Sequence, residues 1–145
     1  IVGLLVWAPW RSNLYQTYHS DAKMLVTERG AEKATDLDRA ATFFNDKKYK
    51  EAQDLLAKLT LQQPGNAMVS YYYGLTLIET NTLSEGRSTL TQVYNGESAF
   101  KYDAAYAMAM SYLKEDKKDE CKAWLKKIPI GTTHYQKAAT LLDKL

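Results

Sequence analysis

Residues 40–64, AATFFNDKKYKEAQDLLAKLTLQQP, decide the fold of this chain. Their apolar side chains recur every three or four positions on both sides of a short polar stretch after Asn45, as in two amphipathic helices joined by a turn. Pro64 then ends the second helix, because proline cannot continue an α-helix. From residue 36 onward no segment has the alternating pattern of a strand, so we expect this region to be all helix.

The same arrangement returns twice at a fixed interval. The pattern recurs 34 residues later and again after a further 35 residues, which indicates an internal repeat. A small residue alternates with large apolar residues in each copy, and two antiparallel helices approach closely only where a small side chain faces a large one. The matching positions are Ala40, Gly74 and Ala109; Phe43, Leu77 and Tyr112; Ala52, Gly86 and Cys121; and Leu56, Leu90 and Leu125.

This spacing and this order of small and large residues resemble the tetratricopeptide repeat over about residues 33–129. The resemblance implies an all-α fold, an α-solenoid of about three helix-turn-helix repeats closed by a C-terminal capping helix. The later copies depart from it at Ser98, which replaces the proline, and at Pro129, which comes early. The expected domain of residues 33–145 divides into repeats at about 33–66, 67–100 and 101–131 and a capping helix at 132–145.

The N-terminal stretch IVGLLVWAPW has no charge before Arg11. Ten apolar residues are about half of what a helix needs to cross a bilayer, but tryptophans followed by an arginine are typical of a membrane interface. We therefore expect residues 1–11 to be the end of a transmembrane helix and residues 12–32 to be an extended linker. An ordinary buried or partner-bound segment is the alternative. The predicted membrane-anchor residues are Leu4, Leu5, Trp7 and Trp10.

Composition and motifs give no sign of catalysis. The 19 basic and 17 acidic side chains are mixed along 145 residues, so no single-sign field points to nucleic acid. The lone Cys121 stands at a repeat position that requires a small residue, which predicts a buried and inert thiol. His19 and His134 lie far apart without ligand or triad spacing, and no glycine-rich phosphate loop is present. We expect no enzyme activity, no catalytic residue, no cofactor, no metal site and no small-molecule substrate.

The resemblance also implies a groove, lined by the first helix of each repeat, that receives a peptide or a helix. Few Lys, Arg or Asn residues fall at these positions, which argues against a clamp for a C-terminal carboxylate. An apolar, aromatic lining suits an amphipathic helix or a hydrophobic segment. The alternative is that individual rings belong to the interhelical core, since three consecutive tyrosines cannot face one way on a helix. The predicted groove residues are Phe44, Tyr71, Tyr72, Leu75, Ile78, Tyr106 and Met110.

The middle of the expected stack is poor in charge. Between Leu61 and Phe100 only four side chains are charged, and depletion of charge is a compositional sign of a covered surface. The cover is a partner, a second copy, or the chain's own linker. The linker residues that would provide it are Tyr15, Tyr18, Met24, Leu25 and Val26.

These observations lead to two functional hypotheses. The wider layout, an apolar N-terminal stretch, a tyrosine-bearing linker and about three repeats, resembles that of bacterial membrane-anchored tetratricopeptide proteins. This resemblance implies the first hypothesis, a membrane-tethered scaffold or accessory subunit within a larger bacterial membrane complex, with protein and membrane as its partners and no nucleic acid. It would sit in the inner membrane as a single-pass protein, with its repeats in the periplasm or, alternatively, the cytoplasm. The second is a soluble interaction module or homodimer whose N-terminal apolar segment packs in a groove of the repeats.

Overall fold

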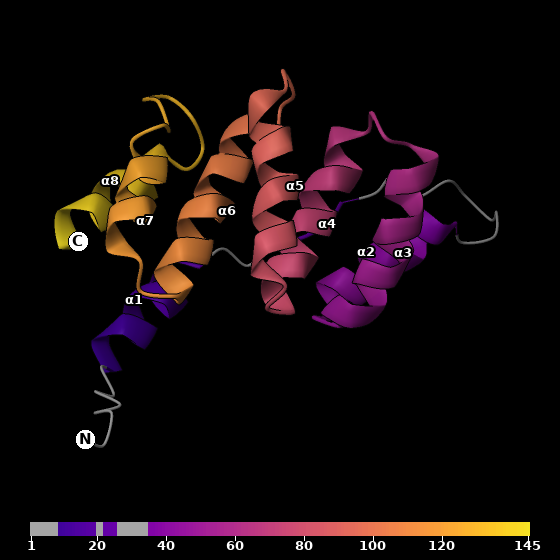
Figure 1. Cartoon of the computed structure of the whole chain (residues 1–145), viewed down its shortest axis with the longest axis horizontal. Helices are drawn as coiled ribbons and strands as arrows, with labels where there is room; N and C mark the ends of the chain where they lie inside the picture. The colour runs from indigo at the N-terminus through magenta and orange to yellow at the C-terminus, as the bar shows by residue number, and fades with distance from the viewer. Residues whose placement is uncertain (1–8, 20–21, 26–34) are drawn as a thin grey trace.

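The protein is described here by a computed structural model that covers residues 9–19, 22–25 and 35–145, with side chains from residue 14 onward. Within these ranges the chain forms eight α-helices and no strand, as the sequence predicts (Figure 1). The helices are α1 (Pro9–Tyr18), α2 (Asp36–Asn45), α3 (Tyr49–Gln62), α4 (Ala67–Glu79), α5 (Leu83–Asn95), α6 (Lys101–Lys114), α7 (Lys118–Leu125) and α8 (Tyr135–Lys144).

Polar side chains cap the first helices of two pairs. The hydroxyl of Thr35 accepts a hydrogen bond from the Asp38 N–H, and the Asp38 carboxylate accepts one from the Thr35 N–H at 2.9 Å. The Asn66 side chain accepts a hydrogen bond from the Val69 N–H at the start of α4. Such caps satisfy backbone N–H groups that have no partner within the helix.

The turns inside the three helix pairs share one backbone conformation. Lys47, Asn81 and Asp116 have positive φ angles of 62°, 61° and 59°, and they are 34 and 35 residues apart. In each turn the next residue donates its N–H to the carbonyl five positions earlier, at 2.8–2.9 Å. This left-handed cap ends the first helix of a pair and reverses the chain into the second. The repeat is therefore present in the backbone as well as in the sequence.

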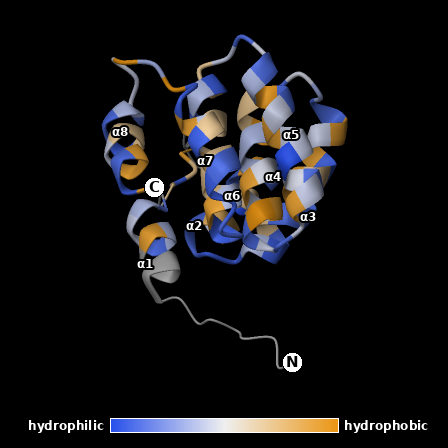
Figure 2. Ribbon diagram, turned by 60° about the vertical axis from the view of Figure 1, so that its left-hand side comes forward, coloured by the Kyte–Doolittle hydropathy of each residue, from blue (hydrophilic) through white to orange (hydrophobic). Residues whose placement is uncertain are grey.

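Each helix from α2 onward packs on the next one in the sequence, so the pairs lie in chain order (Figure 1). The small residues of the repeat pattern lie at close helix contacts. A Cβ on Gly74 would lie 2.8 Å from Leu90, and one on Gly86 would lie 2.8 Å from Ile78. Ala40, which starts the pattern, is fully buried. Hydrophobic and hydrophilic residues alternate along the ribbons, as expected of helices buried on one side (Figure 2).

The expectation of an extended linker from residue 12 is wrong for residues 12–18, which belong to helix α1. This helix packs against α6 and α8, and Leu14, Tyr15 and Tyr18 contact the core cluster formed there. Such tertiary packing supplies most of the stability of a short helix, and local sequence does not reveal it. Residues 1–8 lie outside the described ranges. No helix within those ranges is both long enough and apolar enough to span a bilayer.

Candidate partner-binding groove

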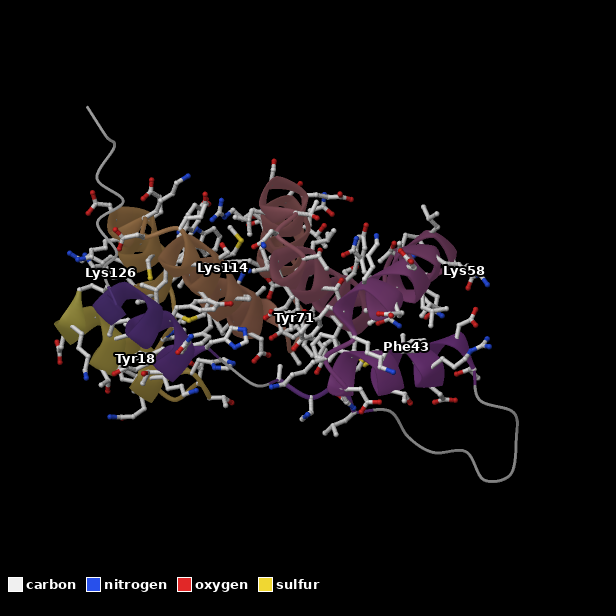
Figure 3. The ribbon with its side chains drawn as sticks, turned by 90° about the horizontal axis from the view of Figure 1, so that it is seen from below. Tyr18, Phe43, Lys58, Tyr71, Lys114 and Lys126 are labelled. Atoms are coloured by element: carbon white, nitrogen blue, oxygen red, sulfur yellow. The ribbon has the colours of Figure 1, made fainter. Side chains whose placement is uncertain are left out.

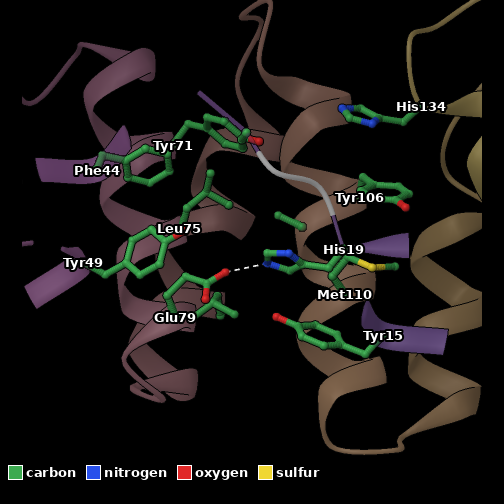
Figure 4. A pocket seen from close by; sticks show the side chains of 13 residues that line it. Tyr15, His19, Phe44, Tyr49, Tyr71, Leu75, Glu79, Tyr106, Met110 and His134 are labelled. Carbon is green, nitrogen blue, oxygen red and sulfur yellow. Dashed lines mark hydrogen bonds and ion pairs between the residues drawn. The ribbon is translucent and has the colours of Figure 1, made fainter. Parts of the chain in front are cut away.

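Helices α2, α4 and α6 line one face of the protein, and this face contains an aromatic pocket (Figure 4). We call this face the groove. Its pocket is lined from these three helices by Phe44, Tyr71, Leu75, Ile78, Glu79, Tyr106, Ala107 and Met110, with Tyr49 at the start of α3. Most of the lining is apolar, and Glu79 is the only carboxylate among the described lining residues.

The groove holds a stretch of the same chain. Residues 14–19 and 22–25, which we call the groove segment, supply Tyr15, His19 and Ala22 to the pocket wall. The segment starts beside α6 and α8 and reaches α2 at Met24, so it runs across all three first helices (Figure 3). The cavity that remains has a volume of about 40 Å³. Because a water molecule needs roughly 10–15 Å³ of such space, only a few could enter.

Asn45, at the end of α2, binds the main chain of the groove segment. Its side-chain oxygen accepts a hydrogen bond from the Met24 N–H at 2.8 Å, and its amide nitrogen donates one to the Met24 carbonyl at 3.0 Å. A side-chain amide that satisfies both main-chain groups of one residue recognises backbone rather than side-chain identity. The Lys23 ammonium adds a hydrogen bond to the Asn45 carbonyl at 3.1 Å.

Two tyrosines bind further main-chain carbonyls of the segment. The Tyr72 hydroxyl, from α4, donates to the Lys23 carbonyl at 3.0 Å, and the Tyr106 hydroxyl, from α6, donates to the Tyr18 carbonyl. Burial raises the pKa of both tyrosines above the ordinary value, so both remain protonated donors over the whole physiological range. Each first helix therefore contributes one side chain that holds the backbone of the segment.

Side chains of the groove segment fix its register. Met24 is 1% exposed and Tyr18 is 7% exposed, so both are inserted into the core. His19 forms a 2.5 Å hydrogen bond through Nε2 to a carboxylate oxygen of Glu79, and the Tyr15 ring lies against the imidazole with ring centroids 4.9 Å apart (Figure 4). Burial, followed by the nearby Glu79 charge, raises the pKa of Tyr15, which keeps its hydroxyl neutral in this pocket.

The second histidine closes the other end of the pocket. His134 Nε2 lies 2.6 Å from a carboxylate oxygen of Asp103, and its ring stacks on Tyr106 with centroids 4.7 Å apart. Each histidine thus joins a terminal region of the chain to a first helix. No group of three or more His, Cys, Asp or Glu residues in the described ranges could hold a metal ion.

The structure brings six of the seven predicted groove residues together around this pocket. Tyr72 is the exception, since it lies outside the pocket lining and contacts the groove segment through its hydroxyl. The three consecutive tyrosines do separate: Tyr71 and Tyr72 are buried, whereas the half-buried Tyr73 donates a hydrogen bond to Glu85. Except for the half-buried Leu75, the predicted groove residues are buried in this arrangement.

Of the proposed sources of cover for the charge-poor centre, the chain's own N-terminal region occupies the groove in this structure. Tyr15, Tyr18 and Met24 contact it as the sequence predicts, but Leu25 is 81% exposed. Val26 lies outside the described residues. So do Leu4, Leu5 and Trp7 of the predicted membrane anchor, and of Trp10 only its place in α1 is described.

Sequence reasoning missed Asn45 and His19 as residues that hold the segment in the groove. Asn45 appears in the sequence only as a helix end, and the partners of His19 and Asn45 lie 60 and 21 residues away. No local sequence pattern predicts hydrogen bonds between residues so far apart. Cys121 is buried and its pKa is raised by burial to about 12, in agreement with the inert thiol that the sequence predicts.

Comparisons of the chain with protein families, with curated proteins and with solved structures find no match.

Proposed function

We propose that this chain is a non-catalytic, membrane-tethered scaffold or accessory subunit of the tetratricopeptide type that binds a segment of a partner protein through the groove. The main-chain contacts of Asn45, Tyr72 and Tyr106 carry this proposal, because they equip three successive first helices to hold a peptide backbone. Repeated recognition of main-chain groups is how a groove accepts an extended segment, and the apolar pockets beside them select side chains.

Two further observations support the repeat assignment on which the proposal rests. The chain forms three successive helix pairs, and the turns inside them recur at intervals of 34 and 35 residues with one left-handed cap. The tether rests on the apolar stretch at residues 1–11 and on its resemblance to the layout of bacterial membrane-anchored proteins. An inner-membrane location, with the repeats on the periplasmic side, follows from that layout and remains part of the proposal.

The test is the composition of the complex that the native protein forms. We expect the protein, extracted in mild detergent, to co-purify with a stoichiometric protein partner. The double substitution of Tyr72→Phe and Tyr106→Phe, made together with His19→Ala and Met24→Ser to loosen the resident segment, should weaken that association while retaining the two rings and their packing. Extraction of the protein as a lone monomer from its native membrane would contradict the proposal.

A second candidate is a soluble module or homodimer whose N-terminal region packs in a groove of the repeats. The seating of residues 14–19 and 22–25 on α2, α4 and α6 shows that the groove accepts N-terminal chain, and this candidate extends that packing to the apolar residues 1–11. Deletion of residues 1–11 separates the two candidates. The tethered protein should move from the membrane to the soluble fraction with its stability unchanged, whereas a protein that packs those residues into itself should lose stability.

A further inference from the structure

The groove segment occupies the place that a partner segment would need. Its backbone takes the hydrogen bonds of Asn45, Tyr72 and Tyr106, and the remaining cavity of about 40 Å³ is too small for another chain. A partner must therefore displace the groove segment in order to bind there. The contacts of the groove segment therefore show which chemical groups the groove can bind.

The contacts define that chemistry position by position. Glu79 is the only carboxylate among the described pocket residues, and it accepts a hydrogen bond from the imidazole at position 19. Five positions later an unbranched apolar side chain, Met24, is buried while its N–H and carbonyl are held by Asn45. The exposed side chains of the segment, such as Gln16 and Leu25, make no demand on sequence.

We propose that the groove segment is a built-in competitor and that the partner is a protein segment of the same chemistry, with a hydrogen-bond-donating His, Lys or Arg five residues before a buried apolar residue. This inference rests on the proposed function and specifies its ligand. Main-chain recognition by Asn45 makes the resident segment replaceable, because any segment of this pattern can offer the same N–H and carbonyl. A tethered competitor sets the affinity or concentration that a partner needs in order to bind, because the competitor is present at an effective concentration on the order of millimolar.

The experiment opens the groove without altering it. In the full-length chain, His19→Ala combined with Met24→Ser removes two anchors of the resident segment, and Leu25→Ser is the matched control at the exposed neighbouring position. The probe is a fluorescein-labelled synthetic peptide of residues 14–25, LYQTYHSDAKML. Fluorescence anisotropy measures its affinity for the intact, opened and control chains, and circular dichroism checks that each chain is folded.

We expect the opened chain to bind the peptide at least about tenfold more tightly than the intact and control chains, because apparent affinity scales with the fraction of open groove. If the double substitution unfolds the chain, His19→Ala alone provides a gentler opening and should give an intermediate gain. Equal affinity for the intact and opened chains would overturn the proposal. So would a dimer of the opened chain in light scattering without peptide, since the occupant would then be a second copy.

Peptide and groove variants test the mode of recognition. Methylation of the Met24 nitrogen in the peptide removes the donor to Asn45, and Asn45→Ala in the opened chain removes both contacts, so each should cost at least about tenfold in affinity. Asn95→Ala, at the exposed end of α5, is the control. A peptide with Lys at position 19 should bind and one with Glu should not, and Glu79→Lys should reverse that preference. Unchanged affinities would contradict main-chain recognition.

The outcomes separate this inference from the proposed function. A native partner that binds the opened chain equally well with and without Asn45→Ala would overturn the groove as its site while leaving a scaffold role through another surface. Tight peptide binding by the opened chain, without any partner in the native membrane, would support the groove chemistry and contradict the scaffold proposal.

Discussion

At the scale of single residues, the absence of a side chain is as informative as its presence. Gly74 and Gly86 allow α4 and α5 to approach closely, since a Cβ at either position would lie 2.8 Å from a carbon of the facing helix. The sequence predicted these contacts because small residues recur at the repeat interval. What it could not supply was the identity of the facing atoms, which depends on the packed geometry.

Gly74→Ala should destabilise the protein by about 1–3 kcal/mol, because the added methyl group overlaps both the Cγ and the Cδ2 atoms of Leu90. Gly65→Ala is the matched control, since a Cβ there would meet nothing within 4 Å, and it should change stability by less than about 0.5 kcal/mol. Urea denaturation followed by circular dichroism measures both values. Equal effects at the two positions would show that close packing at Gly74 is not what limits stability.

A cluster around Arg87 joins α5 to α6 and to the turn that follows α6. Its guanidinium donates to the Ser111 hydroxyl and carbonyl, each at 2.9 Å, and pairs with Glu115 at 2.6 Å. It also stacks over the Tyr112 ring at 3.9 Å. The hydrogen bond from Arg87, helped by its charge and by Lys117, holds the pKa of Glu115 below the ordinary value.

This lowered pKa predicts a pH dependence of stability. A carboxyl group whose pKa is lower in the folded state contributes stability above its unfolded pKa, about 4.3, and loses it as the pH falls through the folded value. Glu115→Gln should therefore lower the urea midpoint at pH 7, and the difference from the parent chain should shrink below about pH 4. Glu97→Gln is the control, because Glu97 forms no ion pair among the described residues. A difference that stays constant from pH 7 to pH 3 would refute the ion-pair explanation.

At the scale of helices and turns, the turns that recur at the repeat spacing share one backbone conformation. The chain reverses at Lys47, Asn81 and Asp116, and each adopts the left-handed conformation that glycine adopts most easily. The sequence indicated a polar turn at each place. It did not indicate the left-handed residue, because lysine, asparagine and aspartate share no propensity strong enough to mark it.

Lys47→Gly should stabilise the protein by about 0.5–1 kcal/mol. The left-handed conformation destabilises a non-glycine residue by roughly 1–2 kcal/mol, so glycine relieves that strain. The greater conformational freedom of glycine in the unfolded chain reduces the gain in stability by about 0.5–1 kcal/mol. Asn81→Gly should give a smaller gain, since asparagine tolerates this conformation better than lysine. Thermal unfolding of both variants provides the measurement, and a loss of stability from Lys47→Gly would contradict the strain that we assign to this turn.

At the scale of the whole molecule, residues 14–19 and 22–25 are part of the folded structure. The groove segment inserts Tyr18 and Met24 into the core and covers the aromatic face of α2, α4 and α6. The helical stack therefore depends on a region that matches none of the repeat positions. A partner that displaces this region must replace the stabilisation that it provides, which couples binding to folding.

Removal of residues 1–25 should destabilise the stack by about 3–6 kcal/mol, because it strips a fully buried methionine and a buried tyrosine from the core. The shortened chain should also bind the dye anilinonaphthalene sulfonate through its uncovered groove. Removal of residues 1–11 retains every described side-chain contact of the groove segment and should change stability by less than about 1 kcal/mol. If both deletions have the same small effect, the groove segment is not part of the core.

The sequence by itself determined the all-helical class, the helix pairs and their small-residue contacts, because these depend on periodicity and on residue size, which are local properties. The sequence also predicted six residues that line the groove pocket in the structure. Only the tertiary structure decided that residues 12–18 are helical, that Asn45, Tyr72 and Tyr106 hold a main chain, and that the chain's own N-terminal region occupies the groove. The main-chain hydrogen bonds join residues 21 to 88 positions apart, and α1 packs on the distant helices α6 and α8, so no local pattern in the sequence encodes these features.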